Sequence, residues 1–185
     1  MKNIYDDLDF FNEYAKMYRS QKGLEGAGEW HQLQPLFPDL TNKEVLDLGC
    51  GYGWHSRYAA ECGAKGVVGI DLSENMIEAA KKRNAHRNIE YQVCDLMEYD
   101  YPIDRYDFVI SNLVLHYIED LDNIYRKIYQ TLKKEGVFLS NIEHPALRAV
   151  SIRNGCMMKP ENLSIGRLII IFIREYGKPI FWERM

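Results

Sequence analysis

Short segments rich in apolar residues alternate along most of the chain with stretches that have the spacing of amphipathic helices. Five of the apolar segments have the length of buried strands: 45–48, 67–70, 89–93, 108–111 and 137–139, the last continuing toward residue 142. Between them, stretches such as 121–132 repeat apolar side chains every three or four positions, which indicates a helix that buries one face. The pattern predicts an α/β fold: a doubly wound, mostly parallel sheet with helices on both faces.

The segments on either side of this core have different patterns. Residues 8–22 and 30–37 have helical spacing, and three glycines lie between them, so we expect residues 1–43 to form an N-terminal helical cap. Residues 44–145 form the expected ligand-binding core, and residues 146–185 an atypical tail that is shortened or altered. In the tail, the apolar run 168–173 and residues 180–182 predict an incomplete pair of strands, with the run at a sheet edge or in a homodimer contact.

Composition narrows the range of environments and partners. A chain of 185 residues, with 46% hydrophobic and 27% charged residues, is expected to be a single soluble domain. Its net charge of −4 argues against nucleic acid and anionic membranes as partners. Three aspartates within residues 6–9 would interrupt a secretory signal, and the longest strictly apolar run has six residues, so we expect a cytoplasmic protein without a membrane span.

The cysteines do not suggest a metal site. The four of them, at positions 50, 62, 94 and 156, contain no CxxC pair and none of the clustering that a structural zinc site needs. We therefore expect reduced thiols and no bound metal.

Glycines and one acid surround the end of the first predicted strand, the edge at which such sheets bind ligands. Gly49, Gly51 and Gly53 follow that strand and predict a tight turn whose backbone a ligand can approach closely. Trp54 stands where the dinucleotide fingerprint G-x-G-x-x-G requires its third glycine, which disfavours NAD. Asp47, two residues before the first glycine, would repel a pyrophosphate and suits a cationic ligand.

The next two strands add groups that suit a nucleoside. Asp71 lies 22 residues after Gly49, a spacing at which an acidic side chain meets ribose hydroxyls. Asp95, at the end of the third strand, can accept the exocyclic amine of a purine, and Leu96 can pack on its ring. The expected ligand thus carries a cationic group, a ribose and a purine.

Residues 45–53 (VLDLGCGYG), with 69–73 (GIDLS) and Met76, resemble the class I S-adenosylmethionine-dependent methyltransferases, and the resemblance spans residues 44–141. It implies a Rossmann-like fold and an enzyme that uses S-adenosylmethionine and releases S-adenosylhomocysteine. Residue by residue, it implies that Asp47, Gly49 and Gly51 surround the methionine part, Asp71 holds the ribose, Leu72 and Met76 flank the adenine, and Asp95 with Leu96 completes the adenine site. Gly53 of the same turn is a further cofactor-binding candidate.

Polar residues after the fourth and fifth strands are candidates for the acceptor side. In the resembling family, segment 111–117 borders the methionine part and the substrate, which makes Asn112 a cofactor-binding candidate and His116 a candidate base. His144 follows the fifth strand and could also accept a proton, although packing for His116 and a turn cap for His144 are alternatives. Arg19 of the cap could hold the cofactor's carboxylate or lie solvated on an amphipathic helix.

The acceptor itself is constrained only by class. Many nucleic-acid amino-methyltransferases have Pro-Pro and an aromatic residue after the position of Asn112, whereas this chain has Leu-Val-Leu. Together with the negative charge, this favours a small-molecule acceptor, while a protein acceptor stays open. Three functions remain: a methyltransferase acting by in-line displacement, a cofactor-binding protein whose altered tail prevents turnover, and, least favoured, a nucleotide-dependent oxidoreductase.

Overall fold

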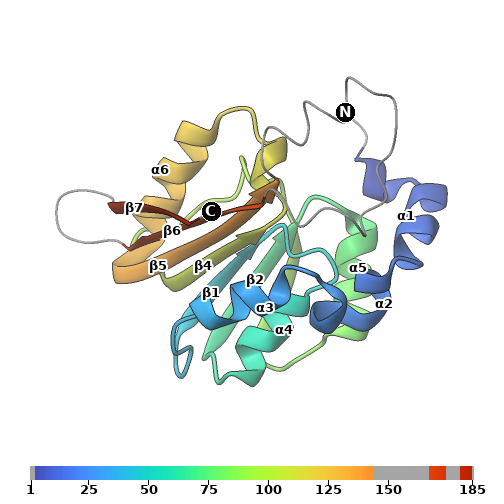
Figure 1. Ribbon diagram of the computed structural model, residues 1–185, viewed down its shortest axis with the longest axis horizontal. Coiled ribbons are helices and arrows are strands. Elements are labelled where there is room, and N and C mark those ends of the chain that lie inside the picture. The colour runs from blue at the N-terminus through green and yellow to red at the C-terminus, as the bar shows by residue number, and fades with distance from the viewer. Residues whose placement is uncertain (1–2, 144–166, 174–179, 185) are drawn as a thin grey trace.

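A computed structural model describes residues 3–143, 167–173 and 180–184, which form one sheet with helices around it (Figure 1). The sheet has the strand order β3-β2-β1-β4-β5-β6-β7; β1 to β5 are parallel, and β6 and β7 are antiparallel to their preceding neighbours. The strands are β1 (Glu44–Leu48), β2 (Gly66–Asp71), β3 (Ile89–Val93), β4 (Tyr106–Asn112), β5 (Leu132–Glu143), β6 (Arg167–Ile173) and β7 (Ile180–Arg184).

Helices precede the sheet and connect most of its strands. The predicted cap contains η1 (Ile4–Asp6), α1 (Leu8–Ala15), α2 (Tyr18–Lys22), η2 (Gly23–Gly26), α3 (Trp30–Leu33) and η3 (Gln34–Leu36). The core contains α4 (Trp54–Glu61), α5 (Glu74–Arg83), η4 (Leu115–Tyr117) and α6 (Leu121–Thr131). The doubly wound fold predicted from the sequence is confirmed.

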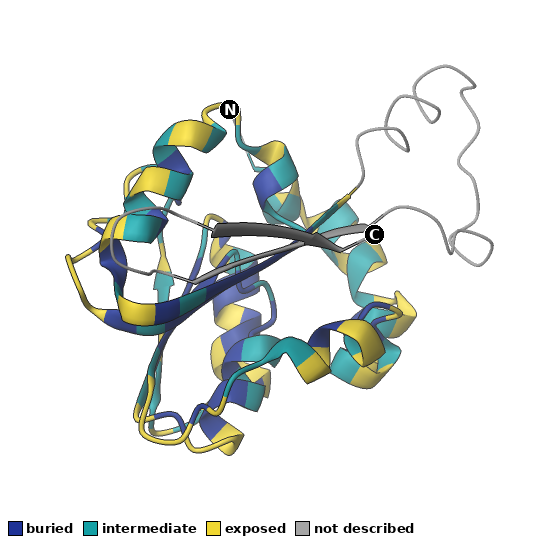
Figure 2. Cartoon of the chain, turned by 60° about the vertical axis from the view of Figure 1, so that its left-hand side comes forward, coloured by how far each residue is buried: buried dark blue, intermediate teal, exposed yellow. Residues whose placement is uncertain are grey.

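Two apolar layers hold the helices against the two faces of the sheet. On one face Val45 of β1 packs in a cluster with Ala59 of α4 and Leu33 of α3. On the other face Leu46, the next residue of β1, packs in a cluster with Ile124 of α6. Alternate residues of a strand point to opposite faces, so a run of apolar residues serves both layers. Figure 2 shows the buried residues along the central strands and on the helix faces turned toward them.

Two local predictions differ from the structure. The helix expected over 8–22 is interrupted at Met17, whose extended backbone (φ −61°, ψ 145°) starts α2 in a new direction. This turn lets the carbonyl of Ser20 accept a hydrogen bond from Arg83 of α5 at 3.2 Å. Strand β5 begins at Leu132 and not at residue 137, with a register shift in its pairing with β4.

The C-terminal strands extend the sheet beyond β5. Strand β6 pairs with β5 over seven residues, from Val137 with Ile173 to Glu143 with Arg167, and β7 pairs with the other side of β6. Both strands of the pair expected in incomplete form are therefore present, and the apolar run 168–173 has neighbours on both sides. Strand β7 is at that edge of the sheet. The homodimer contact stays a prediction, and residues 146–166 lie outside the described part of the chain.

The strand order locates the ligand edge of the sheet. From β1 the chain proceeds through β2 to β3 on one side, and then returns to place β4 and β5 on the other side. The connections that leave β1 and β4 therefore diverge, which opens a crevice at the carboxyl ends of these two strands. The glycine turn follows β1, and Asn112 ends β4, so these predicted site residues meet at this crevice.

Candidate functional site

The β1–α4 turn is anchored to the end of β2 by backbone hydrogen bonds. The N–H groups of Gly49 and Cys50 both donate to the carbonyl of Ile70, at 2.8 and 2.9 Å. The N–H of Gly51 donates to Oδ2 of Asp71 at 2.9 Å. Asp71, the acid predicted at the end of β2, therefore shapes the glycine turn and lies directly beside it.

The three glycines of the turn have left-handed backbones, with φ of +70° at Gly49, +52° at Gly51 and +78° at Gly53. A Cβ at Gly49 would lie 2.3 Å from the side chain of Val114, and one at Gly53 would lie 2.3 Å from the hydroxyl of Tyr91. A Cβ at Gly51 would meet no heavy atom within 4 Å. Gly49 and Gly53 thus permit close packing, whereas Gly51 borders open space that a ligand can enter.

The carboxylate of Asp71 is ordered by the turn. Its Oδ1 accepts the N–H of Ser73 at 2.9 Å while Oδ2 accepts that of Gly51. Burial raises the pKa of Asp71, and the backbone hydrogen bonds oppose that shift. A carboxylate offers about four acceptor positions, so capacity remains for a ligand hydroxyl.

Asp47 lies beneath the turn. Its side chain is 1% exposed, and Oδ2 accepts a hydrogen bond from the hydroxyl of Ser56 in α4 at 2.6 Å. Burial raises the pKa of Asp47 to about 7, although the bonds from Ser56 favour the charged form. Asp47 therefore ties α4 to β1, and its expected contact with a cationic ligand stays a prediction.

A pocket lies between the cap and the glycine turn, at the β1–β4 crevice. It brings together four residues predicted from the sequence: Arg19, Gly49, Gly51 and Asn112. The rest of its lining consists of Tyr14, Ser20, Gly23, Leu24, Ala27, Cys50, Tyr52, Trp54 and His55. The cap and the core therefore build this pocket together.

A chain of buried polar side chains runs behind the pocket, and sequence reasoning missed its central member. Oε1 of Glu29 accepts hydrogen bonds from the guanidinium of Arg19 at 2.9 Å and from the amide of Asn112 at 3.1 Å. Oδ1 of Asn112 in turn accepts a hydrogen bond from the amide of Asn141 at 2.7 Å. Glu29 is 3% exposed, and no periodicity or motif marks it; its position directly before α3 is the sole local signal.

His55, the second residue of α4, also lines the pocket. Its ring lies 5.7 Å from that of Trp30 and stacks at 6.5 Å on that of Phe37. Burial among these rings lowers the pKa of His55 to about 4, so the imidazole is neutral near pH 7.

Comparisons with known proteins agree with this geometry. The family described as "Methyltransferase domain" matches residues 46–140, slightly more than half of the chain. The chain belongs to this family. A crystal structure of an S-adenosylmethionine-dependent methyltransferase from Mesorhizobium loti is similar, with 41% identity and a TM-score of 0.64 over 66% of this chain and 57% of that one. The predicted class I methyltransferase family, its Rossmann-like fold and its cofactor, S-adenosylmethionine, are confirmed.

Curated relatives of this methyltransferase domain are longer proteins. Phosphoethanolamine N-methyltransferase 3 of Arabidopsis thaliana is 34% identical over 71% of this chain, and an uncharacterized Haemophilus influenzae protein is 32% identical over 77%. This chain spans 27% of the former and 59% of the latter.

The methyltransferase domain has the features that its cofactor needs. The open space at Gly51 lets a ligand approach the backbone, and Asp71 beside it has acceptor capacity for a ribose hydroxyl. Arg19 and Asn112, whose side chains carry N–H donors that can bind a carboxylate, line the same pocket. The residues present therefore fit S-adenosylmethionine.

The residues predicted on the adenine side lie outside the lining of the pocket. Leu72 is 51% exposed, whereas Met76 is 3% exposed and packs with Tyr52 beneath the cap. Oδ1 of Asp95 accepts the N–H of Met97 at 2.8 Å, and Leu96 belongs to the apolar core. Met76 and Leu96 thus have packing roles, and the contacts of all four residues with adenine stay predictions.

The two histidines proposed as bases have different standing. His116 lies half-buried in η4, after β4, with its ring 4.2 Å from that of Tyr117. His144 lies outside the described residues. A proton-accepting role stays a prediction for both.

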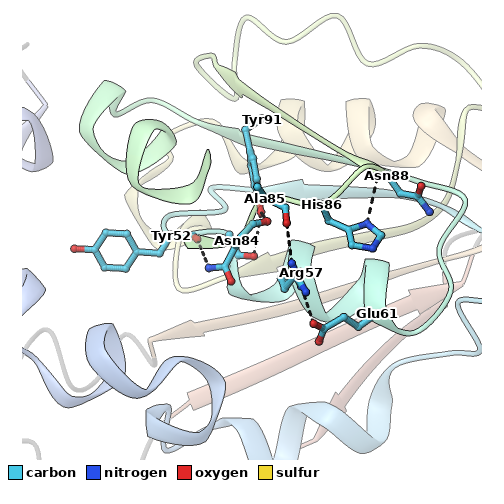
Figure 3. A network of polar contacts seen from close by, with 9 residues as sticks. Tyr52, Arg57, Glu61, Asn84, Ala85, His86, Asn88 and Tyr91 are labelled. Carbon is cyan, nitrogen blue, oxygen red and sulfur yellow. Dashed lines mark hydrogen bonds and ion pairs between the residues drawn. The ribbon is translucent and has the colours of Figure 1, made fainter. Parts of the chain in front are cut away.

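A polar network joins the glycine turn and α4 to the connection between α5 and β3 (Figure 3). The amide of Asn84, which follows α5, donates to the carbonyl of Tyr52 at 2.7 Å. The hydroxyl of Tyr91 lies 3.0 Å from the carbonyl of Asn84 and 3.3 Å from that of Gly53. Arg57 of α4 adds a bond of 2.7 Å to the carbonyl of Ala85. The turn is therefore held from both β2 and the α5–β3 connection.

Other kinds of site receive no support from the part of the chain that the structure describes. Within residues 3–143 and the two C-terminal strands, no group of His, Cys, Asp and Glu is placed to hold a metal ion. Every helix in those ranges is too short or too polar to span a membrane.

Proposed function

We propose that this chain transfers the methyl group of S-adenosylmethionine to a small-molecule acceptor by in-line displacement. The observation that carries the proposal is the meeting of open backbone at Gly51, the ordered carboxylate of Asp71 and the donors of Arg19 and Asn112 around one turn. Family membership supports it.

Each residue has a separate duty in the proposal. Asp71 accepts hydrogen bonds from the ribose hydroxyls, and Gly51 lets the ligand approach the turn. Arg19 and Asn112 orient the amino-acid end, with Arg19 able to bind a carboxylate through two N–H groups. When bound, the cofactor supplies an electrophilic methyl group on a sulfonium, and its thioether leaves without a proton.

Positioning supplies much of the rate enhancement in this proposal, because the leaving group needs no acid. A base matters only if the accepting atom is protonated, and it then adds about 10²- to 10⁴-fold. His116 and His144 are the candidates.

The small-molecule class is supported by the net charge of −4, and by a relative named for the small amine phosphoethanolamine. Phosphoethanolamine is therefore the first acceptor to assay. The second candidate function, cofactor binding without turnover, shares every feature of the site except transfer. Hydride transfer with NAD stays disfavoured because Trp54 replaces the third glycine of the fingerprint.

Calorimetry with S-adenosylhomocysteine tests the cofactor site. Asp71→Asn keeps the size of the side chain and removes its charge, and hydrogen bonds to a charged acceptor contribute about 1.5–3 kcal/mol each. We expect at least a roughly tenfold rise in Kd. Glu78→Gln, an exposed change on α5, is the control and should bind as the wild type does.

The outcomes separate the candidate functions. Unchanged binding by folded Asp71→Asn would remove the assignment of this residue, and tighter binding of NAD than of S-adenosylhomocysteine would favour the oxidoreductase. Formation of S-adenosylhomocysteine with phosphoethanolamine or another small amine supports transfer. Binding without turnover across acceptor classes supports the second candidate.

A further inference from the structure

Glu29 connects two parts of the molecule that are far apart in sequence. One of its partners, Arg19, comes from α2 of the cap, and the other, Asn112, ends β4 of the sheet. Both partners line the pocket, whereas Glu29 does not. The same oxygen, Oε1, accepts from both side chains, so their positions relative to each other depend on one carboxylate.

This arrangement restricts side chains that would otherwise have several rotamers. Arginine is long and flexible, and a fixed ionic partner reduces the conformational entropy lost when it binds a ligand. The side chain of Arg19 is 27% exposed and that of Glu29 is 2% exposed, so solvent screens the pair less than a surface ion pair. Glu29 can therefore hold the guanidinium at the pocket wall.

We propose that Glu29 is a positioning residue, which aims Arg19 and Asn112 at the amino-acid end of the cofactor. The proposal rests on the proposed function, because it concerns one end of the same ligand. It assigns Glu29 no contact with the ligand and no proton transfer. It predicts that the nucleoside end, which lies toward Asp71, is insensitive to Glu29.

Two ligands, one with and one without the amino-acid end, test whether Glu29 affects binding of that end alone. S-adenosylhomocysteine carries the amino-acid end, and 5′-methylthioadenosine lacks it while keeping the nucleoside. For Glu29→Gln, calorimetry should show a rise of about tenfold in the Kd of S-adenosylhomocysteine, equivalent to about 1.4 kcal/mol, with the Kd of 5′-methylthioadenosine unchanged. The matched control is Glu13→Gln, which removes an exposed ion pair with Lys16 in the same cap and should leave both constants unchanged.

A double variant tests whether Glu29 acts through Arg19. Arg19→Gln alone should weaken binding of S-adenosylhomocysteine selectively, and adding Glu29→Gln to it should cause less than the additive loss, because one of the two positioned groups is already absent. Fully additive losses would show that Glu29 acts independently of Arg19 and would overturn the proposal. If Glu29→Gln does not fold, Glu29→Asp, which keeps the charge on a shorter stem, should show a smaller loss restricted to S-adenosylhomocysteine.

The failure of the positioning role is distinguishable from the failure of the proposed function. If the wild type binds neither ligand, the proposed function fails. If the wild type binds both and the Glu29 variants weaken both equally, Glu29 only supports the fold. Unchanged affinity of the variants for S-adenosylhomocysteine also overturns the positioning role.

Discussion

The variants Gly51→Ala and Gly53→Ala each add one methyl group to the glycine turn. We expect Gly51→Ala to be the more stable of the two and to bind the ligand more weakly. Both residues have left-handed backbones, and in that region a residue with a side chain is less stable than glycine by about 1–2 kcal/mol. Gly51→Ala should lose only this amount, because its Cβ would meet no heavy atom within 4 Å. Its methyl group would instead occupy the space beside Asp71 that a ligand needs.

Gly53→Ala adds a steric conflict to the same backbone strain. Its Cβ would lie 2.3 Å from the hydroxyl oxygen and 2.7 Å from Cζ of Tyr91, a side chain that is 6% exposed and held in the core. Overpacking of this kind costs about a further 1–3 kcal/mol. In a protein of this size, Tm falls by about 2–4 °C for each kcal/mol, so Gly53→Ala should melt several degrees below Gly51→Ala.

Thermal and urea unfolding measure the stabilities, and calorimetry with S-adenosylhomocysteine measures the affinities. We expect Gly51→Ala to be the more stable variant and the weaker binder, with a Kd at least roughly tenfold above that of the wild type. Tyr91→Phe in the Gly53→Ala background removes the nearest clashing atom and should recover part of the lost stability. Equal melting temperatures, or wild-type affinity in Gly51→Ala, would refute the division of roles between the two glycines.

Two further predictions concern groups beneath and behind the turn. The pKa of Asp47 is about 7 in the folded protein and about 3.9 in the unfolded chain. The protonated carboxyl therefore stabilises the fold below pH 4, and this stabilisation, about 4 kcal/mol at most, is lost as the pH rises to 7. Urea unfolding between pH 4.5 and 7.5 should show wild type losing stability relative to Asp47→Asn as pH rises, and parallel curves would contradict the buried carboxyl. Asn84→Ala leaves the buried carbonyl of Tyr52 without its donor and should lower the free energy of unfolding by about 1–3 kcal/mol, whereas Glu78→Gln, which removes an exposed pair, should change it by less than about 1 kcal/mol. Equal stability of these two variants would show that the network of Asn84 does not support the turn.

The local features of the core were predictable from sequence because each depends on neighbours in the chain. Apolar spacing predicted the five parallel strands, and Ser73 before α5 is a residue type that favours an N-cap. Its hydroxyl accepts the N–H of Met76 at 3.2 Å. The break in the dinucleotide fingerprint at Trp54 and the position of Asp71 needed only a count along the sequence. These features led to the correct family and cofactor.

The roles of individual residues around the turn were decided by tertiary structure. Gly49 and Gly53 are required by Val114 and Tyr91, which approach from other segments, so the spacing of the glycines cannot separate them from Gly51. Asp47 has a sequence position suited to ligand contact, yet its carboxyl lies under α4 against Ser56.

The contacts of the cap with the core could not be predicted from the sequence. Periodicity reports which side of one element is apolar, and it carries no information about which polar groups meet from different elements. Glu29 lies 83 positions before Asn112, and no local pattern relates them. The packing of the cap over the β1–β4 crevice brings this carboxylate behind the pocket. There it meets Arg19 and Asn112, the partners that a buried charge needs and that its own helix does not provide.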